Sequence, residues 1–502
     1  MAKKKNYDSD FCGSLPLHHI NVIQNYGYLL VIDNDYRIIQ ISENLPELLN
    51  TTNTEIIGNK LEAYIEIDSL KELGQRFTGK SKEKLPLSVL INGQKLFAVA
   101  HFRDNYTILE LEKPEFANER SFTNVYAGLK YAMAAIESSD DIIEVSKIAV
   151  SELKKITGFD GIMMYQFDSD WNGTVIAQEK SDPALEDYMG HTFPASDIPR
   201  QARELYLKNP YRLIPQRDYQ PIKLYPVVNS STNSFIDLSD CNLRGVAAVH
   251  LEYLKNMNVE SSMSIRVIHE GRLWGLIACH HVSPHYLNFE LCSICELLST
   301  VISNRISAIL AKERFSLERT LQEHQTAIIA EIYAKNDIVA ALINNDHTSL
   351  LNMFHSDGMA IYLNGKLNSM GSVPDHDTLD NLMLWLQTKQ IEKVFVTDQL
   401  PALFDEILPF AELASGALVI PVSARKGEYI ICFRPELIYT IKWGGNPNEA
   451  LTFEPNSTKY HPRASFKIWQ QTVQNTSSPW NEFEIKAADN LRSFVYEYIT
   501  KN

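Results

Sequence analysis

The first part of the chain alternates short apolar stretches with turn-forming residues. Apolar and polar positions repeat there with a period near two, which predicts strands at 27–31, 38–41, 87–91, 95–101 and 106–112, with a short helix at 45–49. Short strands that follow one another without long helices between them are typical of a small α+β domain with an antiparallel sheet.

A second set of elements follows residues 116–118, which we interpret as a linker. The pattern predicts helices at 124–138 and 140–157 and a strand at 161–167. Two β-rich runs, 262–268 and 273–279, predict a hairpin whose four-residue turn carries Gly271. This region is a second α+β unit.

One long helix is expected from about 289 to 344. Its apolar residues recur mostly at four-residue steps, at Ile294, Leu298, Ile302, Ile306 and Leu310. At this length, a scaffold helix shared between domains or between subunits is favoured over an isolated globular helix. The last third repeats the α+β rhythm and closes on a helix at 481–499. We therefore predict three tandem α+β domains, at 1–118, 119–315 and 316–502, joined by long helices.

Size and charge narrow the class of protein. The 502 residues are too many for one core. A net charge of -15 argues against a nucleic-acid partner, because phosphate binding needs a basic face. The basic start at Lys3–Lys5 is interpreted as a solvated tail. No apolar run approaches the length of a membrane span, and the N-terminus lacks a signal-peptide region. We expect a cytoplasmic protein that makes no contact with a membrane.

Six cysteines in a chain of this length do not form a disulfide scaffold. Cys292 and Cys295 have metal-like spacing, but they lie in an apolar helical run without a second ligand pair, so two core thiols are expected and no metal site. Cys12 differs because it lies among polar residues near the terminus, where a thiol stays reactive.

The stretch Phe193-Pro-Ala-Ser-Asp-Ile-Pro199 carries the strongest candidate site. Each proline restricts its own backbone and that of its neighbour, which predicts that Asp197 is held in an extended, non-helical turn before a helix at 201–207. A carboxylate held between Phe193 and Tyr206 is a poor core element and a good site element. Taken alone, Asp197 could also be a helix N-cap.

This motif resembles the chromophore-pocket signature of the phytochromes. The rest of the chain is similar to bacterial phytochromes in the same order, through Asp10–Cys12 and Pro16–Ile20, the run His250–Met257, the run Leu273–His281, and Trp443–Pro447 with Pro462–Phe466. The resemblance implies a PAS-like domain with a chromophore-attaching segment at 1–118, a GAF domain at 119–315, and a PHY domain at 316–502 with a tongue hairpin at about 441–476.

The resemblance also implies roles for individual residues around a bilin. Asp197, with Ile198, Pro199 and Tyr206, would lie beside the pyrroles. Arg212 and Arg244 would bind the propionates, because guanidinium groups pair with carboxylates bidentately, and Ser262 and Ser264 would add hydroxyl donors. His250 would pack near the inner pyrroles, Tyr165, Phe193 and Tyr253 would form the wall of the outer ring, and His280 would bond its carbonyl. In the tongue, Trp443, Arg463 and Ser465 would act in switching, with Arg463 paired to Asp197.

The identity of the attaching cysteine decides the pigment. In plant and many cyanobacterial relatives a cysteine directly precedes the histidine that matches His250, but here that residue is Val249. Cys12 is therefore the candidate, and the resemblance then implies biliverdin IXα joined by a thioether. Two stretches depart from the family pattern, Asn25-Tyr26 and Ala247-Ala248.

Each residue alone has an ordinary explanation: a surface ion pair for either arginine, a satisfied core histidine for His280, sheet packing for Tyr165. Together, in the family's order, they favour a pocket. We expect a red/far-red photoreceptor, a homodimer, that signals to a histidine kinase domain or response regulator; no kinase signature is present in the chain. The alternatives are a pigment-free PAS/GAF metabolite sensor, and an enzyme using Asp197 and His250 as acid and base.

Overall fold

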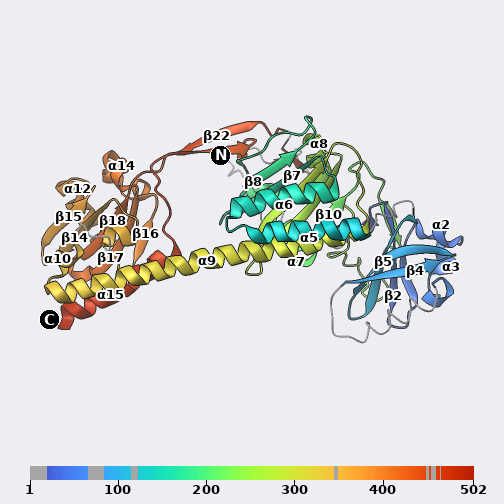
Figure 1. Ribbon diagram of the computed structural model, residues 1–502, viewed down its shortest axis with the longest axis horizontal. Coiled ribbons are helices and arrows are strands. Elements are labelled where there is room, and N and C mark those ends of the chain that lie inside the picture. The colour runs from blue at the N-terminus through green and yellow to red at the C-terminus, as the bar shows by residue number, and fades with distance from the viewer. Residues whose placement is uncertain are drawn as a thin grey trace, which may run out of the picture. The chain divides into compact units, whose positions relative to one another are not determined.

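The structure is a computed structural model that describes residues 20–65, 84–114, 122–343, 349–447, 451–453, 460–463 and 465–501. Cys12 and the expected linker at 116–118 lie outside the described residues. The chain divides into two compact units (Figure 1). One unit comprises Met1–Ile309 with Lys442–Trp469, and the other comprises Leu310–Ile441 with Gln470–Asn502.

The N-terminal sheet of the first unit has seven strands in the order β1-β11-β3-β2-β6-β5-β4. The expected strands and helix are present as β2 (Gly27–Asp33), β3 (Ile38–Ser42), β4 (Leu85–Ile91), β5 (Gln94–Phe102), β6 (Tyr106–Glu112) and α2 (Leu45–Leu49). Apolar residues on one face, among them Leu30, Ile41 and Leu109, form one buried cluster, and Leu29, Val31 and Ile108 belong to another. Two strands were not expected, β1 (Val22–Ile23) and β11 (Ile222–Tyr225), and β11 brings a distant segment onto this sheet.

The second sheet has the order β10-β12-β13-β7-β8-β9-β19-β22. Its strands are β7 (Gly161–Phe167), β8 (Gly173–Lys180), β9 (His191–Phe193), β10 (Tyr211–Ile214), β12 (Ser261–His269), β13 (Arg272–His281), β19 (Tyr439–Gly444) and β22 (Ile468–Val473). The turn of the β12–β13 hairpin is shorter than expected, because His269 already pairs with Arg272. Only Glu270 and Gly271 form it, both at positive φ, as a tight two-residue hairpin turn requires. One pairing, β9 with β19, is parallel.

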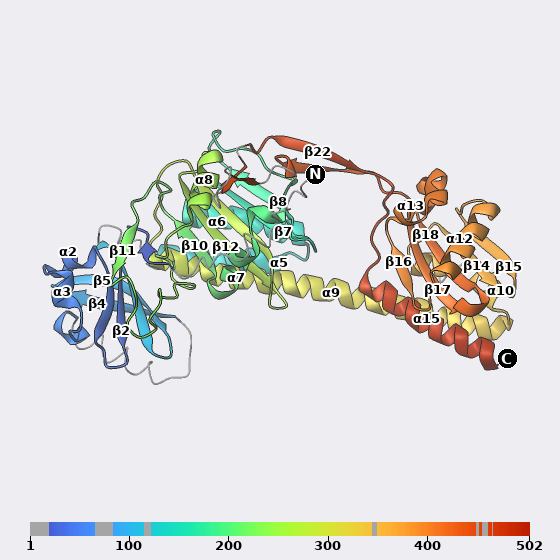
Figure 2. The ribbon, with the colours of Figure 1, turned by 180° about the vertical axis from the view of Figure 1, so that it is seen from behind.

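Helices α5 (Phe122–Ser138), α6 (Ile142–Thr157) and α9 (Phe289–Lys335) accompany this sheet (Figure 2). Arg305 of α9 donates to Ser139 O at 2.7 Å and pairs with Asp140 at 2.5 Å, which joins α9 to the α5–α6 connection. The expected helix to residue 344 is wrong at its end. Asn336 has φ 53°, which stops α9, and Asp337 caps the separate helix α10 (Ile338–Leu342) through the Ala340 amide.

The expectation that no apolar run approaches a membrane span needs correction. Among the described residues, α9 is long and apolar enough to cross a membrane by length and composition alone. Several of its apolar side chains are nevertheless core residues: Leu298, Ile302 and Ile306 are buried in the first unit, and Leu321, Ile328 and Ile332 belong to a core cluster of the second. These positions make α9 a scaffold helix.

The second unit is built on a five-stranded sheet in the order β15-β14-β18-β17-β16. The strands are β14 (Gly358–Leu363), β15 (Lys366–Gly371), β16 (Phe395–Thr397), β17 (Gly416–Ser423) and β18 (Glu428–Arg434). Residues of α15 (Glu482–Lys501) and the end of α9 pack with one face, and residues of α12 (His376–Thr388) and α13 (Leu400–Leu403) pack with the other. The expected C-terminal helix is α15. Together, the sheets and helices confirm the α+β class.

Candidate functional site

A cavity of about 460 Å³ lies in the first unit above the sheet strands β7, β12 and β13. Alternate residues of a strand face opposite sides, so Ser262 and Ser264 line the cavity while Met263 and Ile265 are buried on the other side. The helices α7 (Arg200–Lys208) and α8 (Ala248–Asn256) contribute further lining residues. Every expected pocket residue in the described part of the chain lines this cavity: Tyr165, Phe193, Asp197, Ile198, Pro199, Tyr206, Arg212, Arg244, His250, Tyr253, Ser262, Ser264 and His280.

Two guanidinium groups enter the cavity. Arg212 donates to the carbonyl oxygens of Asn242 at 3.1 Å and Gly245 at 3.0 Å, and also to that of Arg244, so it braces the loop that carries Arg244. Burial lowers the pKa of Arg212, and burial together with the charge of Arg212 lowers the pKa of Arg244 to about 9. Two like charges held in one buried cavity favour an anionic ligand.

The two pocket histidines are neutral. Burial lowers the pKa of His250 to about 4, with a further contribution from the charge of Arg212. Burial also lowers the pKa of His280 to about 4, assisted by His250. The His250 ring lies nearly parallel to Tyr253, with centroids 6.2 Å apart. A neutral imidazole has one donor and one acceptor nitrogen, so each ring can bond a polar edge of a ligand without adding charge.

Asp197 does not have the extended backbone that we expected. Ala195–Asp197 form a single 3-10 turn, and Pro199 is the N-cap residue of α7, so the capping interpretation of Asp197 is also wrong. One carboxylate oxygen of Asp197 accepts hydrogen bonds from the Tyr253 hydroxyl at 2.9 Å and from Arg463 Nη2. Burial raises the pKa of Asp197, and the charge of Arg463 opposes that rise. The pairing of Asp197 with Arg463 that we predicted is present.

Arg463 comes from the tongue, whose described strands are β19, β20 (Leu451–Phe453), β21 (Tyr460–Pro462) and β22. Its Nη1 donates to Gly444 O at 2.6 Å, and its guanidinium carbon lies 5.6 Å from the Phe193 ring and 5.4 Å from the Phe466 ring. Gly444 is required here, since a Cβ would come within 2.6 Å of Phe193. Trp443 is buried in β19 opposite Thr192, whereas Ser465 is exposed and accepts only a long bond from the Lys467 amide, at 3.4 Å.

Sequence reasoning missed several lining residues, among them Ser196, Ala202, Leu205, Asn209, Leu276 and Ala278. A signal existed for two of them, because Leu276 and Ala278 alternate with His280 along β13 and therefore share its face. Ser196 Oγ is buried and has no hydrogen-bond partner among the described residues. This hydroxyl group, the paired arginines and the aromatic wall of Tyr165 and Phe193, with ring centroids 5.6 Å apart, fit an elongated conjugated ligand that carries carboxylates.

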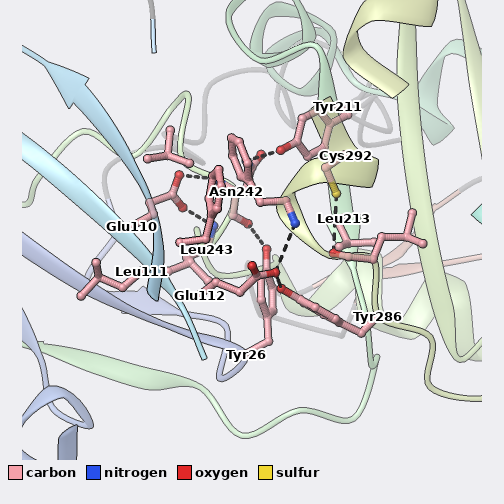
Figure 3. Close-up of a pocket in the computed structure, with 14 residues that line it drawn as sticks. Tyr26, Glu110, Leu111, Glu112, Tyr211, Leu213, Asn242, Leu243, Tyr286 and Cys292 are labelled. Atoms are coloured by element: carbon pink, nitrogen blue, oxygen red, sulfur yellow. Dashed lines mark hydrogen bonds between the residues drawn. The ribbon is translucent and has the colours of Figure 1, made fainter. Parts of the chain in front are cut away.

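A second, smaller cavity of about 50 Å³ lies between the N-terminal sheet and the start of α9 (Figure 3). Tyr26, one of the departures from the family pattern, lines it and donates to Asn242 O at 3.0 Å. Burial raises the pKa of the Cys292 thiol on its wall. The cavity is too small for a cofactor.

Three family models match successive parts of the chain: a PAS fold at residues 12–114, a GAF domain at 141–310 and the phytochrome region at 321–502. The chain is 35% identical to cyanobacterial phytochrome B of Nostoc sp. over 495 residues, which are 97% of this chain and 66% of that one. It is 31% identical to a bacteriophytochrome of Xanthomonas campestris pv. campestris, covering 97% of this chain and 78% of that one.

Solved structures give the same result. A bacteriophytochrome from the photosynthetic bacterium R. palustris superposes with a TM-score of 0.83 at 30% identity, covering 98% of this chain and 99% of that one. The photosensory core module of a Stigmatella aurantiaca phytochrome gives a TM-score of 0.81 at 32% identity and covers 98% of both chains.

Tandem α+β domains with a buried, arginine-lined cavity define a cofactor-binding sensory module. The chain belongs to the phytochrome family and corresponds to its photosensory core, which confirms the predicted family and its function as a light photoreceptor. The family implies a bilin chromophore. The chain spans slightly less than two thirds of the length of the cyanobacterial phytochromes it matches. Our boundaries at 118/119 and 315/316 and the roles of single pocket residues stay predictions.

Proposed function

We propose that this chain is a red/far-red photoreceptor of the bacteriophytochrome type that binds biliverdin IXα covalently. The observation that carries the proposal is the cavity itself. It combines the cationic groups of Arg212 and Arg244 with neutral histidines and an aromatic wall, and its Asp197 is bonded to the tongue. When bound, biliverdin supplies light absorption and isomerisation about its outer methine double bond.

Attachment through Cys12 is supported by the position of the remaining thiols. None of the five cysteines within the described residues lines the cavity, and all are buried. Ile20 does line it, and the chain of eight residues from Cys12 to Ile20 can span up to about 27 Å when extended. Val249, next to His250, faces the cavity where a thioether would otherwise form, and it has no thiol.

The arginines are proposed to bind the two propionates, with Ser262 and Ser264 as additional donors. Both guanidinium groups line the cavity. Arg212 in addition donates to the backbone carbonyls of Asn242 and Gly245. His250 and Tyr206 pack against the inner part of the ligand, and Tyr165, Phe193 and Tyr253 surround its outer ring. His280 donates to the carbonyl of that ring.

We propose that Asp197 couples a change in the chromophore cavity to a rearrangement of the tongue. In the present arrangement its carboxylate holds Arg463 and Tyr253, and the Asn256 amide donates to Arg463 O at 3.1 Å. A change of hydrogen bonds at Asp197 would strand the buried Arg463 charge, which is costly, so the tongue must rearrange with it. Ser465 is the alternative donor to Asp197 after that rearrangement. The tongue is thus a two-state element that the pocket biases.

We infer that the chain works as a cytoplasmic homodimer that signals to a histidine kinase domain or a separate response regulator. Exposed apolar residues on two helices of the first unit support a helical dimer surface, with exposed fractions of 74% for Tyr131 of α5 and 43% for Leu297 of α9. An enzyme that used Asp197 and His250 as acid and base is less well supported, because the Asp197 carboxylate is bonded to Arg463 and Tyr253.

The direct test is an absorption spectrum of the chain produced with biliverdin, recorded before and after red light. We expect a red band that red light converts reversibly into a far-red band. A colourless product, or a pigmented one that light does not change, would contradict the proposal.

The role of Asp197 is tested separately. Asp197→Ala is expected to bind biliverdin and absorb red light but to fail to form the far-red state, and Arg463→Ala is expected to convert with an altered balance and lifetime of the two states. Asp170→Ala, at an exposed position in the same domain, is the matched control. Normal photocycling of Asp197→Ala would remove Asp197 from the mechanism.

A further inference from the structure

A group of metal-ligating side chains lies away from the chromophore cavity, where the N-terminal sheet meets a loop of the neighbouring domain. His101 lies on β5, and Asp240 and Cys241 lie in the loop. A ring nitrogen of His101, a carboxylate oxygen of Asp240 and the sulfur of Cys241 all lie within 4.8 Å of one another. None of the three residues lines the chromophore cavity.

The orientation of the His101 ring is determined by Glu110 of β6. His101 Nε2 lies 2.6 Å from Glu110 Oε1. The Glu110 carboxylate also accepts from the backbone amides of Asn242 at 3.1 Å and Leu243 at 2.6 Å, and these three residues are labelled in Figure 3. Because the carboxylate can only accept, Nε2 must be the protonated nitrogen. A carboxylate that accepts from one histidine nitrogen, so that the other can bind a metal, is a recurring arrangement around metal ions in proteins.

The other nitrogen, His101 Nδ1, is buried and has no hydrogen-bond partner in the part of the chain that the structure describes. It faces Asp240 Oδ2 across 3.6 Å. Arg103 Nη2 bonds the other carboxylate oxygen, Oδ1, and leaves Oδ2 directed at the histidine. A positive charge between these two electron-rich atoms, either a proton or a metal ion, would be stabilised by both of them.

The distances suit a metal ion. Bond lengths of about 2.0–2.3 Å at tetrahedral angles place two zinc ligands about 3.3–3.6 Å apart. The gap from His101 Nδ1 to Asp240 Oδ2 is already at the upper end of this range, and the Cys241 sulfur needs a shift of about 1.2 Å at most to reach it. The Asp240 side chain keeps 17% of its surface exposed, which gives a bulk ion a route to the site.

We propose that His101 Nδ1, Cys241 Sγ and Asp240 Oδ2 form a site for a divalent transition-metal ion, with Zn²⁺ the best fit to this ligand set. One nitrogen, one sulfur and one oxygen ligand suit zinc and disfavour Mg²⁺ and Ca²⁺, which take oxygen ligands alone. Water completes the tetrahedron. On binding, the Cys241 thiol loses its proton and the proton between His101 Nδ1 and Asp240 Oδ2 is displaced, both to solvent. Bonds from zinc to sulfur, nitrogen and oxygen form without any change of oxidation state.

Such an ion would join the N-terminal sheet to the loop that supports the chromophore pocket. Arg212 donates to carbonyls of this same loop, at Asn242 and Gly245. Metal binding would therefore stiffen the segment that carries Arg244.

The test uses the full chain carrying its pigment, freed of metal by a chelator and titrated with Zn²⁺ against a chromophoric competitor. We expect one equivalent to bind, and zinc X-ray absorption to report one sulfur at about 2.3 Å with nitrogen and oxygen at about 2.0–2.1 Å. His101→Gln and Cys241→Ser should each weaken binding by about tenfold or more. Cys279→Ser, which removes another buried thiol of the same unit, should leave it unchanged.

Several results would overturn the proposal. These are zinc bound without sulfur, equal affinity in the wild type and Cys241→Ser, or no zinc uptake at all; in that last case a proton occupies the gap between His101 and Asp240. If a variant fails to fold, judged by its pigment spectrum, the X-ray absorption of the wild-type chain decides alone. The outcome is independent of photoconversion, so it can fail without affecting the proposed photoreceptor mechanism.

Discussion

The sheets of the two units differ in the residues that cover their two faces. In the second unit both faces of β17 are apolar: Leu418 and Ile420 pack into one cluster, and Ala417 and Val419 into the other. In the first unit β12 buries Met263 and Ile265 on one face but turns Ser262 and Ser264 toward the chromophore cavity. A ligand cavity on this scaffold thus requires that small and polar residues replace the apolar set on one face of one strand.

The same contrast holds for large side chains. The second unit fills one sheet face with Tyr429, Phe433 and Phe404, all buried. In the first unit the cavity lies over Leu276, Ala278 and His280, at a place where the second unit has large buried side chains. A ligand bound in this cavity would supply the packing that side chains supply in the second unit.

The largest expected effect is the loss of covalent pigment attachment when the Cys12 thiol is removed. Cys12→Ser should abolish covalent attachment, because none of the cysteines among the described residues lines the cavity. Zinc-induced bilin fluorescence on a denaturing gel measures this directly. Cys279→Ser and Cys241→Ser are the controls and should keep the fluorescence. Pigment retained in Cys12→Ser but lost in either control would show that the attachment site is wrong.

Truncating a core side chain of the second unit should lower stability, whereas filling the cavity of the first unit should block pigment assembly. Phe433→Ala is expected to destabilise the second unit by about 3–5 kcal/mol, because it leaves a void in a closed cluster. Ala278→Leu should leave the stability of the pigment-free chain nearly unchanged but block assembly, because the added atoms occupy ligand space. Denaturant unfolding followed by circular dichroism, with biliverdin uptake measured in parallel, checks both. Equal destabilisation by the two substitutions would remove the distinction between the sheets.

Substitution of the two arginines should have smaller effects, and only one of the two substitutions should also lower thermal stability. Arg244→Ala is expected to weaken biliverdin assembly by about ten- to hundredfold, the contribution of one buried charge-assisted hydrogen bond. Arg212→Ala should also lower thermal stability, because it releases the carbonyls of the 241–245 loop. Assembly kinetics and a melting curve distinguish the variants. Unaltered assembly in both would show that neither arginine binds a propionate.

The smallest effect is a dependence of stability on pH. In the folded, pigment-free chain the pKa of His250 and of His280 is lowered to about 4, from an ordinary value of 6.5. Below pH 6.5 the unfolded chain therefore binds protons that the folded chain does not. Stability should fall as the pH decreases from about 6.5 to about 4, by at most about 1.4 kcal/mol per pH unit for each histidine, and should not change through these groups above that window.

Denaturant titrations across that pH range measure this slope. His280→Gln should reduce the slope by the contribution of one histidine, at most about 1.4 kcal/mol per pH unit, while leaving the stability at pH 8 similar. A slope equal in the wild type and the variant would assign the acid sensitivity to other groups.

Much of the fold was predictable, because each strand and helix imposes its own period on the sequence. Strands β2 to β6 and helices α2, α5 and α6 differ from the prediction by two residues or fewer at each end. The failures have local or distant causes. The end of α9 was missed although Asn336-Asp337 is a stop followed by a cap. The pairing of β11 with β3, and of β9 with β19, joins segments far apart in the chain and leaves no periodic signal.

The candidate site was also predictable only in part. The arginines and histidines were named from motifs, and the structure places them around one cavity. The partners of each group could not be read from the sequence. Whether Arg212 faces a ligand alone or also braces a loop depends on carbonyls about thirty residues away, at Asn242 and Gly245.

The alkylation rates of two buried thiols can report how readily each domain opens. Cys279 in β13 and Cys432 in β18 are fully buried, and burial raises the pKa of Cys279 strongly and that of Cys432 to about 12. Neither can react with an alkylating reagent until its own sheet opens, so the labelling rate of each thiol reports the opening free energy of one domain under native conditions. Light and dark labelling rates of the two thiols would then show whether illumination loosens the sensing domain, its neighbour, or both.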